Sequence, residues 1–312
     1  MVKYCVGIDL GGTSVKFGLF DVSGMLYEQW QLPTDTSESG KNILPDIADS
    51  LRRRLGTSQI DRSEIKGIGI GIPGIVTGEG LVSAAVNLGW TNVEVTRELA
   101  NLTGLPVKTM NDGNTAALGE MWQGSGKGYK NLVMITLGTG IGGGIIIDEQ
   151  PVSGCFGAAG ELGHMTVVND ETEYCRCGRK GCLEQAASAT GIAREAKRLL
   201  SEHKYENSVL TANRNINARS VADAAKAGDR LACDVMERAG RFLGLAMAII
   251  TGVIDPEAYI IGGGVSMAGE FFLDMIQRHY RENVLFISQH TKIRLAGLGN
   301  AAGIYGAARL VL

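Results

Sequence analysis

The chain has 312 residues, of which 45% are hydrophobic, 20% are charged and 6% are aromatic, and its net charge is −3. This composition is typical of a soluble globular protein that is long enough for two domains. A slightly acidic chain lacks the basic surface that nucleic acid or anionic lipid attracts. We therefore expect a protein that acts on small molecules and binds neither nucleic acid nor membranes.

The sequence shows features of neither an exported protein nor a membrane protein. Residues Met1–Tyr4 lead directly into a strand-like run, so we expect no signal peptide and a cytoplasmic protein. The longest apolar stretch, Phe242–Ile254, is too short to span a bilayer and predicts a buried helix. Glycine is frequent, with 44 residues, and clusters in loops after apolar runs, where close approach to phosphate groups is easiest.

The first half of the chain alternates strand-like and helical patterns. Strands are expected at Tyr4–Leu10, Val15–Phe20, Met25–Leu32, Ile65–Ile72 and Val107–Met110. Helices are expected where Ile43, Ile47, Leu51 and Leu55 share one face, at Val93–Leu102, and from about Gly113. This order is typical of a mixed α/β domain.

The pattern then starts again. Further strands are expected at Leu132–Leu137, Gly144–Ile147, Tyr259–Ile261 and Lys292–Leu295. Further helices are expected at Ser188–Ser201, Ser220–Ala227, Asp229–Ile254, Phe271–Tyr280 and Ala301–Leu310. Segments Asp9–Asp21 and Thr136–Asp148 both have the pattern of a strand, a glycine turn and a second strand. They predict a duplicated domain with a cleft between the halves, and the alternative is chance likeness of two glycine-rich hairpins.

Three glycine loops could hold the phosphates of a nucleotide, because backbone N–H groups reach a phosphate only where side chains do not obstruct them. The loops are Gly11-Gly12-Thr13, Gly138-Thr139-Gly140 with the glycines up to Gly144, and Gly262-Gly263-Gly264. The P-loop motif is absent, and the G-x-G-x-x-G match leads into a strand instead of the helix that a dinucleotide site requires. The third loop precedes a helix whose N-terminus could face an anion. Each loop alone could also be a plain hairpin.

Asp9 directly precedes the first glycine turn. A carboxylate at a strand end beside a phosphate loop suits Mg²⁺, bound directly or through water. The alternative is a solvated turn aspartate.

Three cysteines and a histidine have the spacing of a zinc site. Cys175, Cys177 and Cys182 follow His164 closely, and together they offer four ligands for a tetrahedral ion. Four protein ligands leave no open position, so we expect a structural Zn²⁺. The alternative is three reduced cysteines in a flexible loop.

With these motifs in place, the chain resembles the ROK family of sugar kinases, and within it the bacterial ATP-dependent glucokinases. The resemblance runs nearly end to end. It rests on Asp9–Thr13, Asn87–Trp90, Asn111–Glu120, Leu137–Gly144, Gly157–His164 and Cys175–Glu184. The last two segments, with Gly-Glu-x-Gly-His and Cys-x-Cys-Gly-x-x-Gly-Cys-x-Glu, are the most specific.

The resemblance implies an actin-like, ribonuclease-H-like α/β fold of two lobes with a cleft between them. We expect a smaller lobe of residues 1–118 plus 300–312, and a larger lobe of residues 119–299 that carries the zinc loop. The implied activity is transfer of the γ-phosphoryl group of ATP to the 6-hydroxyl of glucose, with ATP, Mg²⁺ and structural Zn²⁺ as cofactors. The partners are a sugar and a nucleotide, and the implied assembly is a homo-oligomer, either a dimer or a tetramer.

The resemblance also implies the roles of single residues. Asp112 is the implied catalytic base, although its position alone would equally suit an N-cap of the following helix. The implied sugar ligands are Asn87, Asn111, Asp112, Glu161, His164 and Glu184. If one ring nitrogen of His164 binds zinc, the other can donate to a sugar hydroxyl.

Two alternatives to a glucose kinase stay open. A kinase for an N-acylhexosamine or fructose would use much the same loops, and Asn87–Trp90 with the wider similarity favours glucose. A sugar-sensing repressor would need a DNA-binding segment before Gly11, where we expect no room for one. A non-catalytic sugar-binding module is disfavoured because Asp9, Thr13 and Asp112 are all present.

Overall fold

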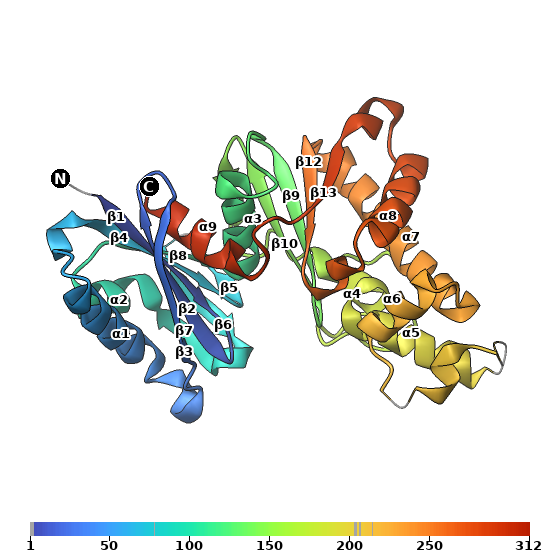
Figure 1. Ribbon diagram of the computed structural model, residues 1–312, viewed down its shortest axis with the longest axis horizontal. Helices are drawn as coiled ribbons and strands as arrows, with labels where there is room; N and C mark the ends of the chain where they lie inside the picture. Colours follow the sequence, from blue (N-terminus) through green and yellow to red (C-terminus); the bar gives the residue numbers. More distant parts are fainter. Residues whose placement is uncertain (1–2, 78, 203–204, 206, 214) are drawn as a thin grey trace. The chain divides into compact units, whose positions relative to one another are not determined.

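The computed structural model describes residues 3–77, 79–202, 205, 207–213 and 215–312 (Figure 1). The chain divides into two compact units. Unit 1 consists of Met1–Leu132, Gly144–Gly160 and Gly297–Leu312, and unit 2 consists of Val133–Gly143 and Glu161–Ala296. The two lobes expected from the sequence, residues 1–118 plus 300–312 and residues 119–299, stay a prediction.

Unit 1 is built on a five-stranded sheet in the order β3-β2-β1-β4-β8. The strands are β1 (Tyr4–Leu10), β2 (Ser14–Asp21), β3 (Leu26–Pro33), β4 (Ile65–Ile72) and β8 (Val107–Asn111). The first three form antiparallel hairpins, and β4 and β8 continue the sheet parallel to β1. All five strands are confirmed to within one residue at each end, because apolar residues in a run or in alternation mark them and turn residues lie close to their ends.

Helices cover both faces of this sheet (Figure 1). They are α1 (Ile43–Thr57), α2 (Val95–Thr103), α3 (Asp112–Gln123) and α9 (Ala302–Leu310). The apolar faces of α1 and α2 pack with Val6, Ile8 and Leu10 of β1 in the main core, whereas α9 packs with Cys5 and Phe20 on the opposite face. Alternation along β1 therefore sends neighbouring side chains to different helix layers.

The backbones of α3 and α9 touch where two glycines face each other. A Cβ atom on Gly306 would lie 1.6 Å from the carbonyl oxygen of Thr115, and one on Gly119 would lie 2.1 Å from that of Ala302. No side chain fits at either position. Helix α3 is consequently fixed against α9 by backbone contact.

Unit 1 also contains a small antiparallel sheet that the sequence analysis did not predict. Its strands are β5 (Ile75–Val76), β6 (Leu81–Ala85) and β7 (Trp90–Glu94). The helix expected from Val93 begins instead at Val95, because Val93 pairs with Val82 of β6. A two-turn apolar pattern does not distinguish the last residues of a strand from the first of a helix.

A second sheet has the order β11-β10-β9-β12-β13. Its strands are β9 (Leu132–Leu137), β10 (Ile141–Ile147), β11 (Gln150–Pro151), β12 (Ala258–Gly262) and β13 (Lys292–Leu295). The boundary between the units falls within β10, after Gly143. Numbered within its own sheet, each set of strands runs 3-2-1-4-5, so the two sheets share one topology, as the duplication hypothesis requires.

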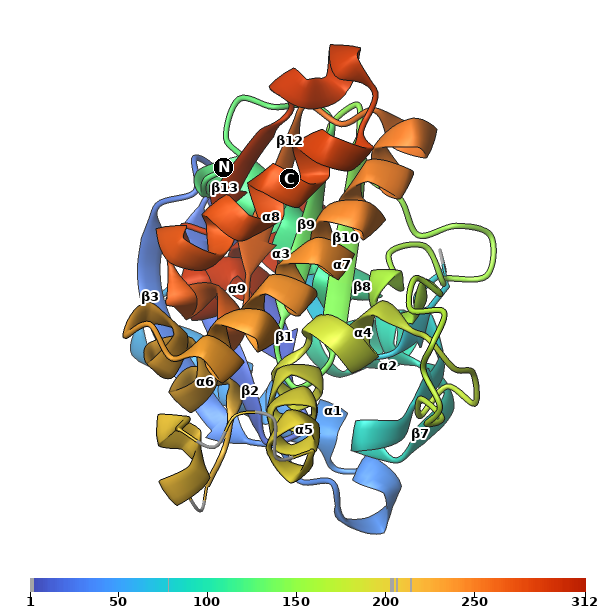
Figure 2. The ribbon, with the colours of Figure 1, turned by 90° about the vertical axis from the view of Figure 1, so that its right-hand side faces the viewer.

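The helices of unit 2 are mostly those expected from apolar periodicity. They are α4 (Leu183–Ala187), α5 (Ala189–Ser201), α6 (Ala218–Lys226), α7 (Arg230–Ile254) and α8 (Glu270–Asn283). Figure 2 shows α7 and α8 in front of β9 and β12. Only α4 was missed, since five residues are too few to show a helical period. No helix in the described part of the chain is both long and apolar enough to cross a membrane.

Short 3₁₀ helices connect several of these elements. They lie at Ser37–Gly40, Arg62–Glu64, Val86–Leu88, Leu162–His164, Val209–Ala212, Gly264–Ala268, Phe286–His290 and Gly299–Ala301. Three of them, at Val86–Leu88, Leu162–His164 and Gly264–Ala268, carry residues that the sequence analysis assigned to sugar, metal or nucleotide binding.

Candidate functional site

The first glycine turn of unit 1 joins β1 to β2 and is held in shape by backbone hydrogen bonds. Gly11 N–H donates to the carbonyl of Ser14 at 2.9 Å, and the Thr34 hydroxyl donates to the carbonyl of Gly11 at 2.7 Å. The Thr34 N–H donates to the carbonyl of Thr13 at 3.1 Å, and Thr13 itself is exposed. The turn is therefore rigid and presents the Thr13 side chain to solvent.

Two candidate residues lie beside this turn. Asp9 faces Lys16 across the β1–β2 pair, with 3.2 Å between its Oδ2 and the Lys16 Nζ. On its other side, a Cβ atom on Gly303 would lie 2.7 Å from the Asp9 Cγ. Asn87 is exposed and lies next to Gly12, where an added Cβ would be 3.4 Å from the Asn87 Cβ. A magnesium ion at Asp9 would share the carboxylate with Lys16 or bind it through water.

Asn111 and Asp112 occupy the junction of β8 and α3. The Asn111 side chain is the N-cap of α3: its Oδ1 accepts the N–H groups of Gly113 at 2.9 Å and Asn114 at 3.2 Å. Its Nδ2 donates to the carbonyl of Gly74 at 3.0 Å. The capping role that the sequence left open for Asp112 therefore belongs to Asn111.

Asp112 is the first residue of α3, and its side chain is exposed. Its Oδ1 accepts the N–H of Gly113 at 2.9 Å. A carboxylate in the first turn of a helix is stabilised by the positive end of the helix dipole. The carboxylate of Asp112 thus has a defined position at the solvent-facing end of a well-packed helix.

The four proposed zinc ligands of unit 2 come together. One ligand atom from each of His164, Cys175, Cys177 and Cys182 lies within 4.8 Å of the other three. Sγ of Cys177 is 3.5 Å from Sγ of Cys182, and Sγ of Cys175 is 3.6 Å from Nδ1 of His164. A tetrahedral site with ordinary Zn–S and Zn–N bonds has ligand–ligand distances of about 3.6–3.8 Å. The donor set and its spacing therefore fit zinc.

The three thiols have different acidities before a metal binds. Backbone N–H donation from Arg179 lowers the pKa of the Cys177 thiol to about 6, whereas burial raises the pKa of Cys175 and of Cys182. Backbone bonds from Val167 and Val168 to the carbonyl of Gly181 fold the loop back on itself. A bound zinc ion would hold all three cysteines as thiolates.

Glu184 links the zinc ligands to the second glycine loop. Its Oε1 accepts the thiol of Cys175 at 3.0 Å and lies 3.7 Å from Nδ1 of His164. A Cβ atom on Gly140 would lie 2.6 Å from its Oε2. The other imidazole nitrogen, Nε2 of His164, lies 3.9 Å from Oε2 of the exposed Glu161. Nδ1 therefore faces the cysteines, and Nε2 faces Glu161.

The second glycine loop, between β9 and β10, opens onto a pocket within unit 2. Gly138 N–H donates to the carbonyl of Gly140 at 3.0 Å, and the carbonyl of Gly138 accepts the N–H of Ala189 at 2.9 Å. Thr139 is exposed at the tip. Thr139, Gly140, Cys175 and Glu184 are among the residues that line a pocket of about 220 Å³. The strand β10 after this loop also confirms that it is not a dinucleotide-binding turn.

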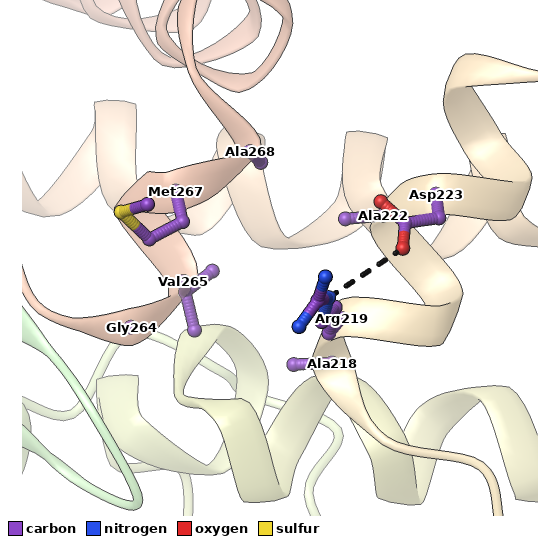
Figure 3. A pocket seen from close by; sticks show the side chains of 8 residues that line it. All are labelled: Ala218, Arg219, Ala222, Asp223, Gly264, Val265, Met267 and Ala268. Atoms are coloured by element: carbon purple, nitrogen blue, oxygen red, sulfur yellow. Dashed lines mark ion pairs between the residues drawn. The ribbon is translucent and has the colours of Figure 1, made fainter.

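The third glycine loop follows β12 and borders a larger pocket, of about 420 Å³. Gly263 has a φ of 85°, and the 3₁₀ helix Gly264–Ala268 follows, so the helix α8 starts only at Glu270. Figure 3 shows Val265 and Met267 on one side of the pocket and Arg219 with Asp223, from α6, on the other. Its lining comprises Ala218, Arg219, Ala222, Asp223, Gly264, Val265, Met267 and Ala268.

The α6 side of this pocket was missed from the sequence. Arg219 and Asp223 form an ion pair at 3.8 Å, and nothing in their spacing marks them as different from any solvated i, i+4 pair. Only the fold brings them opposite Gly264, some forty residues later in the chain.

The site residues predicted from the sequence fall into two sets, one in each unit. Unit 1 brings together Asp9, Gly11, Gly12, Thr13 and Asn87, and it carries Asn111 and Asp112 at one helix start. Unit 2 brings together Glu161, His164, Cys175, Cys177, Cys182 and Glu184 with the loop Gly138–Gly140, and it carries Gly262–Gly264 beside the larger pocket. Their assigned roles stay predictions.

The chain is similar to known proteins in sequence and in structure over nearly its full length. A glucokinase from Halalkalibacterium halodurans is 41% identical over 99% of this chain and 95% of that protein. The crystal structure of a ROK hexokinase from Thermus thermophilus has a TM-score of 0.83 at 30% identity, covering 98% of this chain and 96% of that one.

A third likeness concerns a complex. The crystal structure of a ROK family glucokinase from Streptomyces griseus, in complex with glucose and AMPPNP, has a TM-score of 0.76 at 34% identity and covers 98% of both chains. These structural likenesses confirm the actin-like α/β fold expected from the sequence. The ROK family model matches residues 5–312, and we conclude that the chain belongs to the ROK family.

Proposed function

We propose that this protein is an ATP-dependent glucokinase, which transfers the γ-phosphoryl group of ATP to the 6-hydroxyl of glucose. The observation that carries the proposal is the exposed carboxylate of Asp112, fixed at the start of α3 by the Asn111 cap. The 41% identity to a glucokinase over nearly the whole chain supports the same activity.

Asp112 acts as the general base. Phosphoryl transfer needs alignment and charge neutralisation more than covalent help from the protein. A carboxylate within hydrogen-bond reach of the 6-hydroxyl orients that oxygen and accepts its proton as the phosphoryl group arrives. Asn111 serves as the cap, and the Asp112 carboxylate, whose Oδ1 also accepts the Gly113 N–H, is exposed to solvent.

Recognition of the sugar falls to amide, carboxylate and imidazole groups. Glu161, His164 and Glu184 lie together in unit 2, and the proposal requires them to act on the same sugar as Asn87 and Asn111 of unit 1. With Nδ1 of His164 facing the cysteines, Nε2 carries the proton and donates to a sugar hydroxyl or to Glu161. Polar groups of this kind reject a sugar that lacks or misplaces one hydroxyl.

The nucleotide is held by glycine loops and by the larger pocket. We assign the phosphates to Thr13 with Gly11 and Gly12, and to the loop Gly138–Gly140. We place the adenine ring of ATP in the pocket beside Gly262–Gly264. There Met267 and Val265 supply apolar surface, and Arg219 supplies a planar cation. Mg²⁺ bound with the nucleotide neutralises phosphate charge, and Asp9 is the residue that would hold it.

Zinc has a structural role in this proposal. All four positions of the ion are filled by His164 and the three cysteines, so the site offers no place for a reacting water. The ion would fix the segment that carries Glu161, and it would fix the imidazole of His164 in one tautomer.

Location and assembly complete the proposal. We place the protein in the cytoplasm, where thiols stay reduced and can hold zinc. We also propose a homo-oligomer. Its support is a group of exposed apolar side chains in unit 2, namely Ile249, Val253, Leu285, Phe286 and Ile287. Light scattering on the wild type and on Phe286→Asp tests this assembly, and a monomeric wild type contradicts it.

The test of function is the initial rate of ADP release with MgATP and a panel of sugars: glucose, mannose, fructose, N-acetylglucosamine and N-acetylmannosamine. We expect a clear preference for glucose. A preference for an N-acyl sugar would keep the mechanism and refute the substrate. Absence of ADP release with every sugar would refute the kinase and favour a sugar-binding module.

A further inference from the structure

Glu120, near the C-terminal end of α3, is a fully buried acidic residue that the proposed reaction does not use. Its side chain is 0% exposed. The carboxylate accepts three backbone N–H groups, from Ser125 at 2.8 Å, Gly297 at 3.0 Å and Leu298 at 2.8 Å. Burial of a carboxylate is unfavourable unless hydrogen bonds replace its hydration, and here three donors do so. The carboxylate therefore fixes the backbone at two places far apart in sequence.

Both places adjoin positions where the chain passes from one unit to the other. The chain passes between the units four times, after residues 132, 143, 160 and 296. Gly297 is the first residue after the last of these passages. Ser125 lies in the connection between α3 and β9, which leads to the first passage. Glu120 thus ties α3 to the backbone beside two passages.

A second buried polar residue of α3 adjoins another passage. Asn114 is 1% exposed, and its Oδ1 accepts the N–H of Ile145, two residues after the passage at 143, at 3.2 Å. A Cβ atom on Gly144 would lie 2.5 Å from the carbonyl oxygen of Gly113 and 2.6 Å from the Cβ of Ala117. The backbone of β10 therefore presses directly on α3. Helix α3 adjoins three of the four passages.

We propose that Glu120 is a positioning residue for phosphoryl transfer. Its three hydrogen bonds fix segments 124–126 and 297–298 to α3, the same helix whose first residue is Asp112. The inference rests on the proposed function, in which Asp112 of unit 1 and the loop Gly138–Gly140 of unit 2 act on one transferred group. Holding the backbone beside the passages on α3 limits how Asp112 and the loop Gly138–Gly140 can be aligned.

The expected kinetic effect is on the turnover step. Misplacing reacting groups by about 1 Å costs up to about 10²-fold in rate. MgATP binding should change less than turnover, because the loops Gly138–Gly140 and Gly262–Gly264 and the larger pocket lie in unit 2, and only Asp9 with the turn Gly11–Thr13 contributes to the nucleotide from unit 1.

The deciding variant is Glu120→Gln. Glutamine keeps the size of the side chain but offers one acceptor oxygen, and its NH₂ group cannot accept from a backbone N–H. We expect kcat with glucose to fall at least about tenfold while the KM for MgATP stays within about threefold. A kcat within about twofold of the wild type would overturn the positioning role.

Thr251→Val is the matched control. Thr251 is 4% exposed in unit 2, and its hydroxyl contacts the hydroxyls of Tyr259 at 2.9 Å and Tyr280 at 3.1 Å. Its removal breaks a buried hydrogen-bonded network whose residues contact none of the segments that Glu120 holds. We expect a lowered Tm and an unchanged kcat. An equal loss of kcat in this control would mean that any loss of stability lowers turnover, which also overturns the proposal.

Hydrogen exchange gives a readout that does not depend on activity. In Glu120→Gln we expect the amides of Ser125, Gly297 and Leu298 to exchange at least about tenfold faster, with β1 amides unchanged. If the wild type fails to phosphorylate glucose, the proposed function is refuted, and the exchange data still decide whether Glu120 holds these segments. Unchanged exchange at all three amides would refute the anchor itself.

Gly297→Ala covers the case in which Glu120→Gln does not fold. It keeps the carboxylate, and the new Cβ would lie 2.9 Å from Oγ of Ser125 and 3.8 Å from Oε2 of Glu120. We expect a smaller loss of kcat, about threefold, in the same direction. A folded Gly297→Ala protein with wild-type kcat would overturn the proposal.

Discussion

Unit 1 holds its candidate site residues at the ends of regular elements, whereas unit 2 holds most of its own on an irregular segment. Asp9 lies in β1, Asn111 ends β8 and Asp112 begins α3. Residues 161–182, which carry Glu161 and the four zinc ligands, contain a single helix, the 3₁₀ helix Leu162–His164. Hydrogen-bonded ladders and a helix cap fix the first set, whereas turn hydrogen bonds hold the second and a bound metal ion would add to them.

We therefore expect the site residues of unit 1 and those of unit 2 to lose their positions under different conditions. Residues at strand ends lose their positions only when the sheet unfolds. A loop held by zinc loses its order with the metal, because the binding free energy of the ion is the ordering free energy of the loop. The tryptophans allow the two to be followed separately, since Trp30, Trp90 and Trp122 all lie in unit 1 and the chain has 3 tryptophans.

The largest effect is expected from Asp112→Asn. Asparagine keeps the size of the side chain and the Oδ1 acceptor for the Gly113 N–H and loses only the charge at the helix start, so the variant should fold with a Tm slightly below that of the wild type. Loss of the general base should lower kcat about 10²–10⁴-fold while glucose still binds. Steady-state kinetics and calorimetric titration with glucose check the two parts, and a kcat within about tenfold of the wild type would remove Asp112 from this role.

Removal of zinc should affect unit 2 and leave unit 1 unchanged. We expect about one zinc ion per chain by elemental analysis, and Cys177→Ser or chelation should weaken glucose binding about 10–100-fold. Tryptophan emission should stay that of the native protein, because it reports on unit 1. Full activity in a zinc-free preparation would refute the metal site, and a shifted emission would refute the separation of the two halves.

Glu195→Gln tests the packing of unit 2 through pH. Glu195 on α5 accepts hydrogen bonds from Arg198 at 2.8 Å and from Arg238 of α7 at 3.1 Å, and the Arg198 hydrogen bond with the two charges lowers the pKa of Glu195. A lowered pKa in the folded state means that the carboxylate stabilises the fold above its unfolded pKa and that this stability is lost as pH falls through the folded value.

The variant should therefore be less stable than the wild type by about 1–3 kcal/mol at pH 7. The difference should shrink as the pH falls below the ordinary glutamate pKa of about 4.3, and it should vanish once the pH is below the lowered pKa of the folded state, where the carboxyl of the wild type is also protonated. Far-ultraviolet circular dichroism during urea unfolding measures it, since the tryptophans do not report on unit 2. A difference that is independent of pH would contradict the stated cause.

The smallest effect is expected from Asn111→Ala. It removes the N-cap of α3 and should cost about 1–2 kcal/mol of unfolding free energy in unit 1. Urea unfolding followed by tryptophan emission measures this loss. Asn111→Asp serves as the control, because aspartate caps a helix as well as asparagine but cannot donate to Gly74. Equal stability of the alanine variant and the wild type would show that the cap does not fix this helix start.

The same contrast explains what the sequence could predict. Strands such as Tyr4–Leu10 and Ile65–Ile72 were found because apolar runs that end at glycine or proline are local signals. The zinc ligands were found because Cys175, Cys177 and Cys182 are close in the chain. In both cases the pattern needs no knowledge of tertiary contacts.

What was missed depends on contacts between distant segments. The capping role of Asn111 instead of Asp112 depends on the conformation at the end of β8. The pocket wall formed by Arg219 and the three N–H groups around Glu120 come from segments brought together only by the fold. No residue type or spacing near Glu120 distinguishes it from a solvated helix glutamate.

The central claim is that this chain phosphorylates glucose at its 6-hydroxyl. The most direct measurement is a phosphorus NMR spectrum of the reaction of wild-type protein with MgATP and glucose. The account predicts that the γ-phosphate signals are replaced by those of ADP and glucose 6-phosphate, and that Asp112→Asn leaves the ATP spectrum nearly unchanged over the same time. Hydrolysis to inorganic phosphate without a sugar phosphate, or no reaction in the wild type, would contradict it.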